Sequence, residues 1–423
     1  MSSSTKLSLA AAILISVNIM LGTGVFINTV ILAQKTGALG FLLYLISGTL
    51  MLPLILCVAQ LSALQAQGNF FTFGALISPF FGFISTWSYF FAKLASASLS
   101  IHVFNTFLKA TCPFLSCVPT LFLDLCLLSL FVLLNTLKVH IGKRIQAGFL
   151  SMKIILFCFA LFVGLYCAKL INIGAPHHIW SGIPIGLPLV FFCLLGFEAS
   201  CSLSHLIENS QKNAPLAIIT AFSIVVGIIT IYQFLFYASV GPSALSQQSN
   251  YTNAFPLLVA AISPTLVPYL APFFSIAIAT SALGGAYGIL YINGWNLYNL
   301  AQRTMVIGSS RLSALNAHGI PTLCIVAQGL TCALFILLTG GSQIPLQYTA
   351  VLGSIATYAI CVCALFKHSR SYLSIAGILT CIVLLAISLY AFIKTSIIPL
   401  CFFIAILASG VIMFFNNTTA KER

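Results

Sequence analysis

The stretch IAGILTCIVLLAISLYAF, residues 375–392, contains no charged side chain and is apolar almost throughout. A helix needs about 20 mostly apolar residues to cross the hydrocarbon core of a bilayer. Similar runs recur along the 423-residue chain, in which 60% of the residues are hydrophobic and only 5% are charged. A soluble domain carries about 25% charged residues. The composition therefore excludes a soluble or disordered protein and predicts a polytopic membrane protein.

The apolar runs predict helices rather than the strands of a membrane barrel. Barrel strands alternate in hydrophobicity over about ten residues, whereas runs such as 154–165 are continuously apolar. We therefore expect an all-α protein with one polytopic domain over residues 1–423, and we expect the first run to be a membrane helix rather than a cleaved signal peptide. About twelve membrane helices are predicted, at residues 8–33, 38–63, 78–108, 119–138, 145–169, 184–207, 215–240, 264–300, 320–338, 345–366, 371–393 and 396–415.

Basic residues predict the orientation of the chain, because cytoplasmic loops of membrane proteins are enriched in Lys and Arg. With the N-terminus inside, the cytoplasmic side carries Lys6, Lys138, Lys143, Arg144, Lys212, Arg303, Arg311, Lys367, Arg370, Lys421 and Arg423. The other side carries only Lys35, Lys109, Lys169 and Lys394. Both termini are therefore expected in the cytoplasm, with the protein in a bacterial inner membrane. This bias accounts for the net charge of +13. Because the sequence has no basic stripe, the charge does not indicate nucleic-acid binding.

Two predicted spans are interrupted at matched positions. The first contains Leu21-Gly-Thr-Gly-Val-Phe26, and the sixth contains several Gly and Pro residues before Leu194-Leu-Gly-Phe-Glu198. Glycine weakens a helix, and irregular backbone at membrane depth is tolerated where it is buried in protein or lines a cavity. Close helix packing is the alternative explanation for such glycines. Two interruptions at equivalent positions favour a transporter with two inverted repeats, at about 8–169 and 184–366, followed by additional helices at about 371–415.

The residues around these interruptions resemble a known family. Asn18-Ile-Met-Leu-Gly-Thr-Gly-Val-Phe26 resembles the first-helix signature of the amino acid–polyamine–organocation superfamily. Gly196-Phe-Glu198, then Glu208-Asn209 and Ala214-Pro215, resemble its sixth helix and the following loop, and Leu283-Gly-Gly285 fits its eighth helix. The similarity covers spans one to ten. The nearest characterised type is the bacterial arginine/agmatine antiporter. It implies the leucine-transporter-type fold, with a 5+5 inverted repeat and broken helices 1 and 6.

The resemblance places an amino acid substrate between the two broken helices. Thr23, Gly24 and Val25 would offer backbone N–H groups and a positive helix end to the carboxylate. Carbonyls near Ile19 and Met20 would bind the ammonium group. In the sixth span the corresponding carbonyls are near Phe192 and Leu195, and the ring of Phe192 would cap the substrate, although packing or lipid contact is the ordinary role of one Phe among 35.

Glu198 and Lys153 are ionisable residues at membrane depth, where such groups usually face a cavity and a partner. The resemblance places Glu198 in an inner gate with Tyr89 and Tyr358, and burial would suit it to carry a proton. The alternative is a glutamate at the headgroups. Lys153 lies where family members carry a lysine in place of the sodium ion of sodium-coupled relatives. It could instead extend to the cytoplasmic interface.

Lys93 departs from the pattern of the antiporter, in which the matching stretch of span three carries no charge. A lysine in the side-chain pocket would disfavour arginine or agmatine, and it could pair with Glu198, bind an acidic or polar substrate side chain, or face another helix. Ala286 or Tyr287 stands where the antiporter has a tryptophan. Both departures argue against arginine. A further acid, Asp124, begins span four and is expected at the membrane interface.

The sequence therefore predicts a secondary active amino acid transporter that works by alternating access, either as a proton-coupled symporter or as an exchanger. A polyamine or organic cation antiporter is the alternative, followed by a channel or a non-transporting scaffold. An enzyme is not expected, because no reactive constellation such as HExxH or GxSxG occurs. Neither a GxxxxGK[ST] motif nor a metal-ligand cluster is present, so no cofactor is predicted. The expected partners are the substrate, protons, the lipid bilayer and a second copy in a homodimer.

Overall fold

The computed structural model describes residues 6–65, 68–137, 139–174, 182–246, 252 and 254–422, and within these ranges it does not describe the side chains of residues 139–144, 146 and 418–422. Lys138 and Arg423, used above to predict orientation, lie outside the described residues, and the side chains of Lys143, Arg144 and Lys421 are not described.

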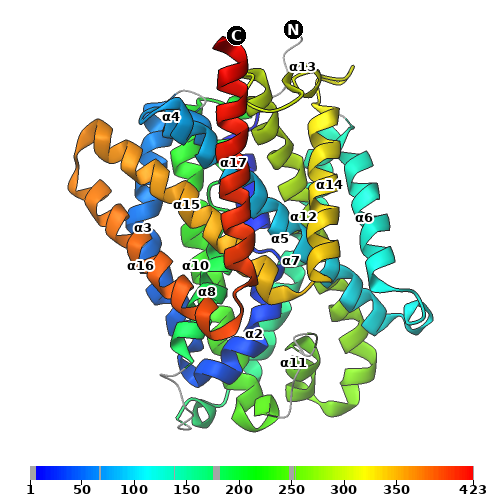
Figure 1. Ribbon diagram of the computed structural model, residues 1–423. Coiled ribbons are helices and arrows are strands. Elements are labelled where there is room, and N and C mark those ends of the chain that lie inside the picture. Colours follow the sequence, from blue (N-terminus) through cyan, green and yellow to red (C-terminus); the bar gives the residue numbers. More distant parts are fainter. Residues whose placement is uncertain are drawn as a thin grey trace.

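The described chain is a bundle of helices (Figure 1). The α-helices are α1 Leu9–Met20, α2 Thr23–Thr36, α3 Gly40–Leu64, α4 Phe70–Ala75, α5 Pro79–Thr111, α6 Thr120–Asn135, α7 Val139–Cys167, α8 Ile183–Leu194, α9 Ala199–Ser202, α10 Ser210–Ser246, α11 Ala254–Ile262, α12 Val267–Gln302, α13 Ser309–Leu312, α14 Thr322–Thr339, α15 Gln343–Ser369, α16 Tyr372–Thr395 and α17 Ile398–Glu422. Short 3-10 turns are η1 Gly37–Leu39, η2 Pro113–Leu115, η3 Leu170–Asn172, η4 Ser204–Leu206 and η6 Pro264–Leu266.

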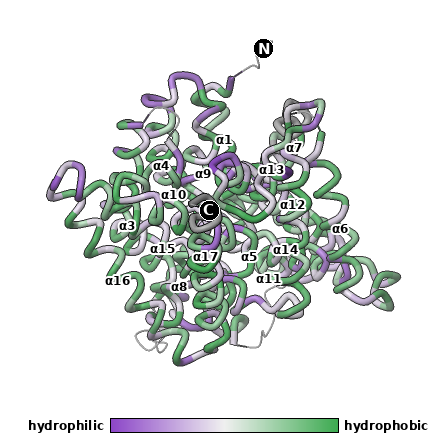
Figure 2. Tube along the Cα trace, turned by 45° about the horizontal axis from the view of Figure 1, so that its top comes forward, coloured by the Kyte–Doolittle hydropathy of each residue, from purple (hydrophilic) through white to green (hydrophobic). Residues whose placement is uncertain are grey.

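Helix occupies each of the twelve apolar ranges predicted from the sequence, but fewer than twelve helical stretches are long and apolar enough to cross a membrane. Within the described ranges, 9 stretches are long and apolar enough to do so. One of them, Thr23–Leu64, runs through α2 and α3, while α1 and α6 are apolar but shorter than a span. The helix α5 is long, yet it is not among the nine, because Ser, Thr and Lys side chains lower its hydropathy. Hydrophobic residues predominate along most helices in Figure 2.

The helix α5 lies in the interior of the bundle and packs against α12, α15, α4, α14, α6 and α17. Small residues permit this close packing, as they commonly do between membrane helices. A Cβ atom on Gly353 of α15 would lie 2.8 Å from the Cβ of Ala92 and 3.0 Å from the carbonyl oxygen of Ser88. The polar residues of α5 are therefore enclosed by protein instead of facing lipid. The described chain begins and ends at the same end of the bundle (Figure 1).

Two changes of backbone direction meet in the interior. The helix α1 ends at Met20, Gly22 has an extended conformation (φ −82°, ψ −154°), and α2 begins at Thr23. The helix α8 ends at Leu194, and Gly196 follows with a φ of 119°, which side chains rarely permit. A Cβ atom on Gly196 would lie 3.0 Å from Cγ2 of Ile19 and 3.2 Å from the backbone nitrogen of Met20. Glycine is therefore required both for the local backbone and for this close approach.

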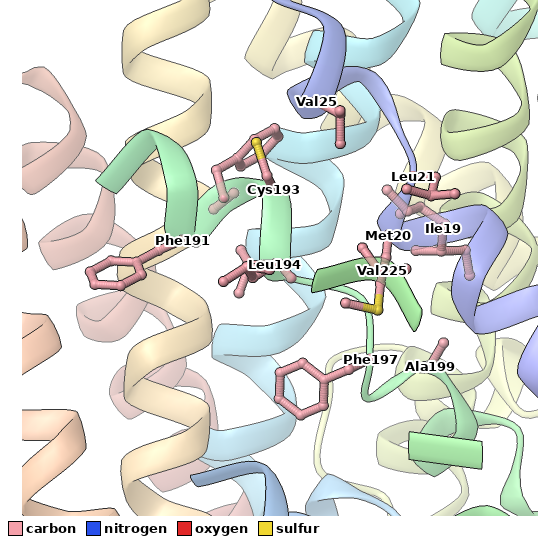
Figure 3. Close-up of a cluster of buried hydrophobic side chains, with 14 of the residues drawn as sticks. Ile19, Met20, Leu21, Val25, Phe191, Cys193, Leu194, Phe197, Ala199 and Val225 are labelled. Carbon is pink, nitrogen blue, oxygen red and sulfur yellow. The ribbon is translucent and has the colours of Figure 1, made fainter. Parts of the chain in front are cut away.

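Apolar side chains fill the space around these two turns (Figure 3). Ile19, Met20 and Leu21 extend from the end of α1, and Cys193 and Leu194 extend from the end of α8. All of them are at least 90% buried. This packing holds the end of α1 against the end of α8, so a site between the two has rigid apolar walls.

Candidate functional site

A small cavity of about 30 Å³ lies where the two backbone turns meet. Space of this size admits only one or two water molecules, so in this conformation the cavity is smaller than an amino acid. The helices α1, α2, α5, α8 and α12 supply the walls. The lining residues are Ile19, Met20, Gly22, Thr23, Gly24, Lys93, Ser96, Ser100, Phe192, Cys193, Leu195, Gly285 and Ile289.

The first turn of α2 presents its backbone to this cavity. Gly22 precedes the helix and has no side chain with which to occupy the unpaired N–H groups of the first turn. The Thr23 hydroxyl donates to Oγ of Ser100 at 2.6 Å, which fixes this turn to α5. An uncapped helix N-terminus attracts anions, so the arrangement suits a carboxylate.

The ring of Phe192 closes the cavity from α8. A Cβ atom on Gly24 would lie 2.7 Å from Cδ1 of this ring, so the ring rests directly on the glycine. The carbonyl oxygen of Phe192 accepts a bond from the N–H of Leu195 at 3.3 Å. One lone pair of that carbonyl oxygen is therefore occupied. The second lone pair can accept a further hydrogen bond. Val25, predicted beside Thr23 and Gly24, is buried but does not line the cavity.

Lys93 and Glu198 form a buried ion pair beside the cavity. The Nζ of Lys93 on α5 lies 2.5 Å from Oε1 of Glu198, and the two side chains are 2% and 0% exposed. The other carboxylate oxygen, Oε2, accepts the backbone N–H of Gly196 at 2.9 Å. Lys93 also lies over the ring of Tyr89, 5.2 Å from its centre. Of the alternatives for Lys93, the structure therefore shows pairing with Glu198, and Lys93 also borders the cavity.

Tyr89 and Tyr358 lie near Glu198 and are not part of the cavity lining. Their side chains are fully buried, and both hydroxyls interact electrostatically with the Glu198 carboxyl. Neither hydroxyl has the geometry of a formed hydrogen bond. The structure thus brings Tyr89, Tyr358 and Glu198 together, from α5, α15 and the segment between α8 and α9.

Lys153 lies at the end of α1 rather than in the cavity lining. Its Nζ donates to the carbonyl oxygen of Asn18 at 2.5 Å, and its side chain is 0% exposed. The last carbonyls of a helix have no partner within the helix, so this ammonium satisfies one of them from α7. Lys153 does not extend to the membrane interface.

The sequence analysis did not identify the wall of the cavity formed by Ser96, Ser100 and Ile289. Ser96 and Ser100 follow Lys93 at three and seven residues, so the three share one face of α5. That spacing is the feature of the sequence from which Ser96 and Ser100 could have been predicted. Tyr287, considered as a replacement for the antiporter's tryptophan, does not line the cavity and packs on Phe131 at 5.6 Å between ring centres.

A second buried polar cluster was also missed, around Asn28 on α2. Its amide nitrogen donates to the carbonyl oxygen of Leu189 at 3.1 Å. Its amide oxygen accepts from Nε2 of Gln343 at 2.9 Å and of Gln347 at 3.2 Å. The Asn28 amide therefore joins α2, α8 and α15. These helices are distant in sequence, so no local pattern predicts the contact.

The side chain of Asp124, which the sequence places at the membrane interface, is buried in the protein. Its carboxylate lies 2.7 Å from Nδ1 of His102 and accepts the amide of Asn105 at 2.7 Å. Both partners are on α5. A buried carboxylate is stabilised by such partners, so Asp124 fastens α6 to α5.

The chain matches the amino acid permease family over residues 7–422. It is 22% identical over 382 residues to the "uncharacterized amino acid permease YtnA" of Bacillus subtilis, covering 85% of this chain and 80% of that protein. It is 22% identical over 350 residues to the D-serine/D-alanine/glycine transporter of Escherichia coli K12, covering 77% and 70%.

A rabbit protein, the b(0,+)-type amino acid transporter 1, is 21% identical over 304 residues, which cover 68% of this chain and 62% of that protein. The match therefore spans less than two thirds of the rabbit protein's length. These relatives are transporters rather than enzymes, and the apolar helices fit an integral membrane protein. The chain belongs to the amino acid permease family of the amino acid–polyamine–organocation superfamily.

Proposed function

We propose that this protein is a secondary active transporter of amino acids that works by alternating access. The observation that carries the proposal is the small cavity at the junction of α1, α2 and α8, lined by the uncapped first turn of α2. A site at interrupted helices is the arrangement that many secondary transporters use. The substrate carboxylate binds at Thr23 and Gly24, and its ammonium group binds at the carbonyls near Ile19, Met20 and Leu195.

Alternating access requires a barrier that opens on each side of the site. Glu198, Tyr89 and Tyr358 form the inner barrier of the proposed cycle, with Lys93 as the counter-charge. The two repeats, residues 8–169 and 184–366, move relative to each other about the cavity, and α1 with α2 and α8 with α9 are the broken helices of a leucine-transporter-type fold with twelve spans. Proton-coupled symport and amino acid exchange are both consistent with this barrier.

The proposed environment is a bacterial inner membrane with both termini in the cytoplasm. The distribution of Lys and Arg supports this orientation. The last two helices, α16 and α17, carry many exposed apolar side chains, and they are the proposed contact with lipid or with a second copy in a homodimer. A buried cation at the cavity disfavours the alternative substrate class, the polyamines and organic cations.

Uptake into liposomes tests this proposal. The purified protein is reconstituted and supplied with radiolabelled amino acids, with and without an inward proton gradient and with and without unlabelled amino acid inside. Saturable uptake of an amino acid above that of protein-free liposomes is expected. Dependence on the proton gradient identifies symport, and dependence on preloaded amino acid identifies exchange. The absence of uptake and of counterflow for every amino acid contradicts the proposal.

A further inference from the structure

Among the described residues that line the cavity, Lys93 is the only charged one. Its partner Glu198 is not part of that lining and is completely buried, whereas Lys93 keeps 2% of its surface exposed. The lysine is therefore the member of the pair that a bound substrate meets. Ser96 and Ser100 extend the same polar face of α5 along the cavity wall.

The ammonium group of Lys93 retains hydrogen-bonding capacity. A lysine ammonium has three N–H donors and no acceptor. The described contacts of Lys93 are with Oε1 of Glu198 at 2.5 Å and with the face of the Tyr89 ring. A substrate atom that approaches from the cavity can therefore accept a further bond, while Glu198 keeps the pair electrically neutral.

The same charge opposes a cationic side chain. The attraction between Lys93 and Glu198 is already satisfied at 2.5 Å, and the nearest charge presented to the cavity is positive. In a buried site, charges are poorly screened. A guanidinium or a second ammonium would therefore have to displace Lys93 from Glu198 or remain beside it unpaired.

The walls of the cavity also restrict the length of a side chain. The ring of Phe192 rests on Gly24, and Ile289 of α12 is also part of the lining. The free space is about 30 Å³. Because packed interiors have few voids, a long substrate side chain would have to displace more of these apolar walls than a short one.

We infer that Lys93 makes the site selective for small amino acids whose side chains present an oxygen acceptor, such as the serine hydroxyl, and that it excludes cationic amino acids and amines. This inference rests on the proposed transport function and names the substrate class of the same site. Lys93 contacts the substrate side chain directly and is the specificity-determining residue.

Competition for binding tests the inference with L-serine, L-alanine and L-arginine. Alanine matches serine in size but lacks the hydroxyl. Serine is expected to compete at about tenfold lower concentration than alanine, since a site that bonds a substrate hydroxyl rejects the analogue without it. Arginine is expected not to compete. Equal competition by alanine and serine, or competition by arginine at serine concentrations, overturns the inference but leaves amino acid transport standing.

The double variant Lys93→Met/Glu198→Gln removes both charges and leaves neither buried without its partner. The preference for serine over alanine is expected to disappear in this variant. Lys109→Met is the matched control, since Lys109 lies on the same helix but bonds the carbonyl oxygen of Val118 outside the cavity. An unchanged preference in the double variant also overturns the inference. If the double variant does not fold, the wild-type competition decides. If the wild type binds no amino acid, the proposed function itself fails.

Discussion

The ammonium group of Lys153 on α7 donates to the carbonyl oxygen of Asn18, in the last turn of α1, at 2.5 Å. Residues 135 positions apart are joined at the point where α1 stops and the cavity begins. A helix end that is buried needs an external partner. Lys153 supplies one, so the position of the first wall of the cavity depends on a side chain from another helix.

We expect Lys153→Met to reduce amino acid uptake by about tenfold or more, because the carbonyl oxygen of Asn18 at the end of α1 loses its bond from the Lys153 ammonium group, a buried hydrogen bond of a charged group. Uptake by reconstituted protein measures the effect. Lys169→Met, which changes an exposed lysine just after the same helix, is the control and is expected to have no effect. Wild-type uptake is also expected to persist when sodium is replaced by choline, since Lys153 supplies the cation. A sodium requirement would contradict this role.

The ion pair of Lys93 and Glu198 is expected to show strong coupling in a double-variant cycle. Lys93→Met or Glu198→Gln alone leaves one buried group without its counter-charge, and removing one partner of a buried pair costs about 3–5 kcal/mol. The double variant is expected to recover most of that loss. The measurement is thermal unfolding of the four proteins in detergent. Additive effects of the two substitutions would show that the pair is not coupled.

Gly24→Ala is expected to abolish uptake, because its Cβ would lie 2.7 Å from the ring of Phe192. Since the clash is with a side chain, Phe192→Ala in the same protein is expected to restore space, with partial recovery of substrate binding. Gly227→Ala serves as control, as nothing lies within 4 Å of a Cβ atom there. Binding is measured by substrate-induced thermal stabilisation. Normal uptake by the Gly24→Ala protein would show that Phe192 does not close the cavity.

His205 predicts a dependence of stability on pH. It follows the candidate span Ile183–Ser202 in the turn η4, and its ring packs on Trp295 with 5.1 Å between centres. Its partial burial, which was not predicted from the sequence, lowers the pKa of His205 from 6.5 to about 4. The unfolded chain therefore binds a proton that the folded chain excludes, and folding stability falls as the pH decreases from about 6.5 to about 4.

His205→Gln removes this titration, so its stability is expected to change less between pH 7 and pH 5 than that of the wild type. The difference between the two proteins in thermal unfolding temperature isolates the histidine from other titrating groups. Identical pH profiles would show that His205 has the same pKa in the folded and unfolded chain.

Local sequence predicted most of the helices but not their partners. Every predicted apolar range contains helix, because helix formation in lipid depends on runs of apolar residues that satisfy their own backbone. Leu21–Val25 and Leu194–Glu198 also marked the positions where helices end, since glycine is the residue that tolerates such turns. Asp124, in contrast, was placed at the interface, because its burial depends on His102 and Asn105 of another helix.

The sequence by itself determined that this chain is a helical membrane protein and that its first and sixth apolar segments are interrupted. Hydropathy and glycine act locally, so they can be read from neighbouring residues. Only the tertiary structure decided that Lys93 is paired with Glu198 and still borders the cavity, and that Ser96, Ser100 and Ile289 complete the walls. These relationships join residues that are distant in sequence. They arise from the packing of α5 on α12 and from its contact with the segment between α8 and α9, which no single segment encodes.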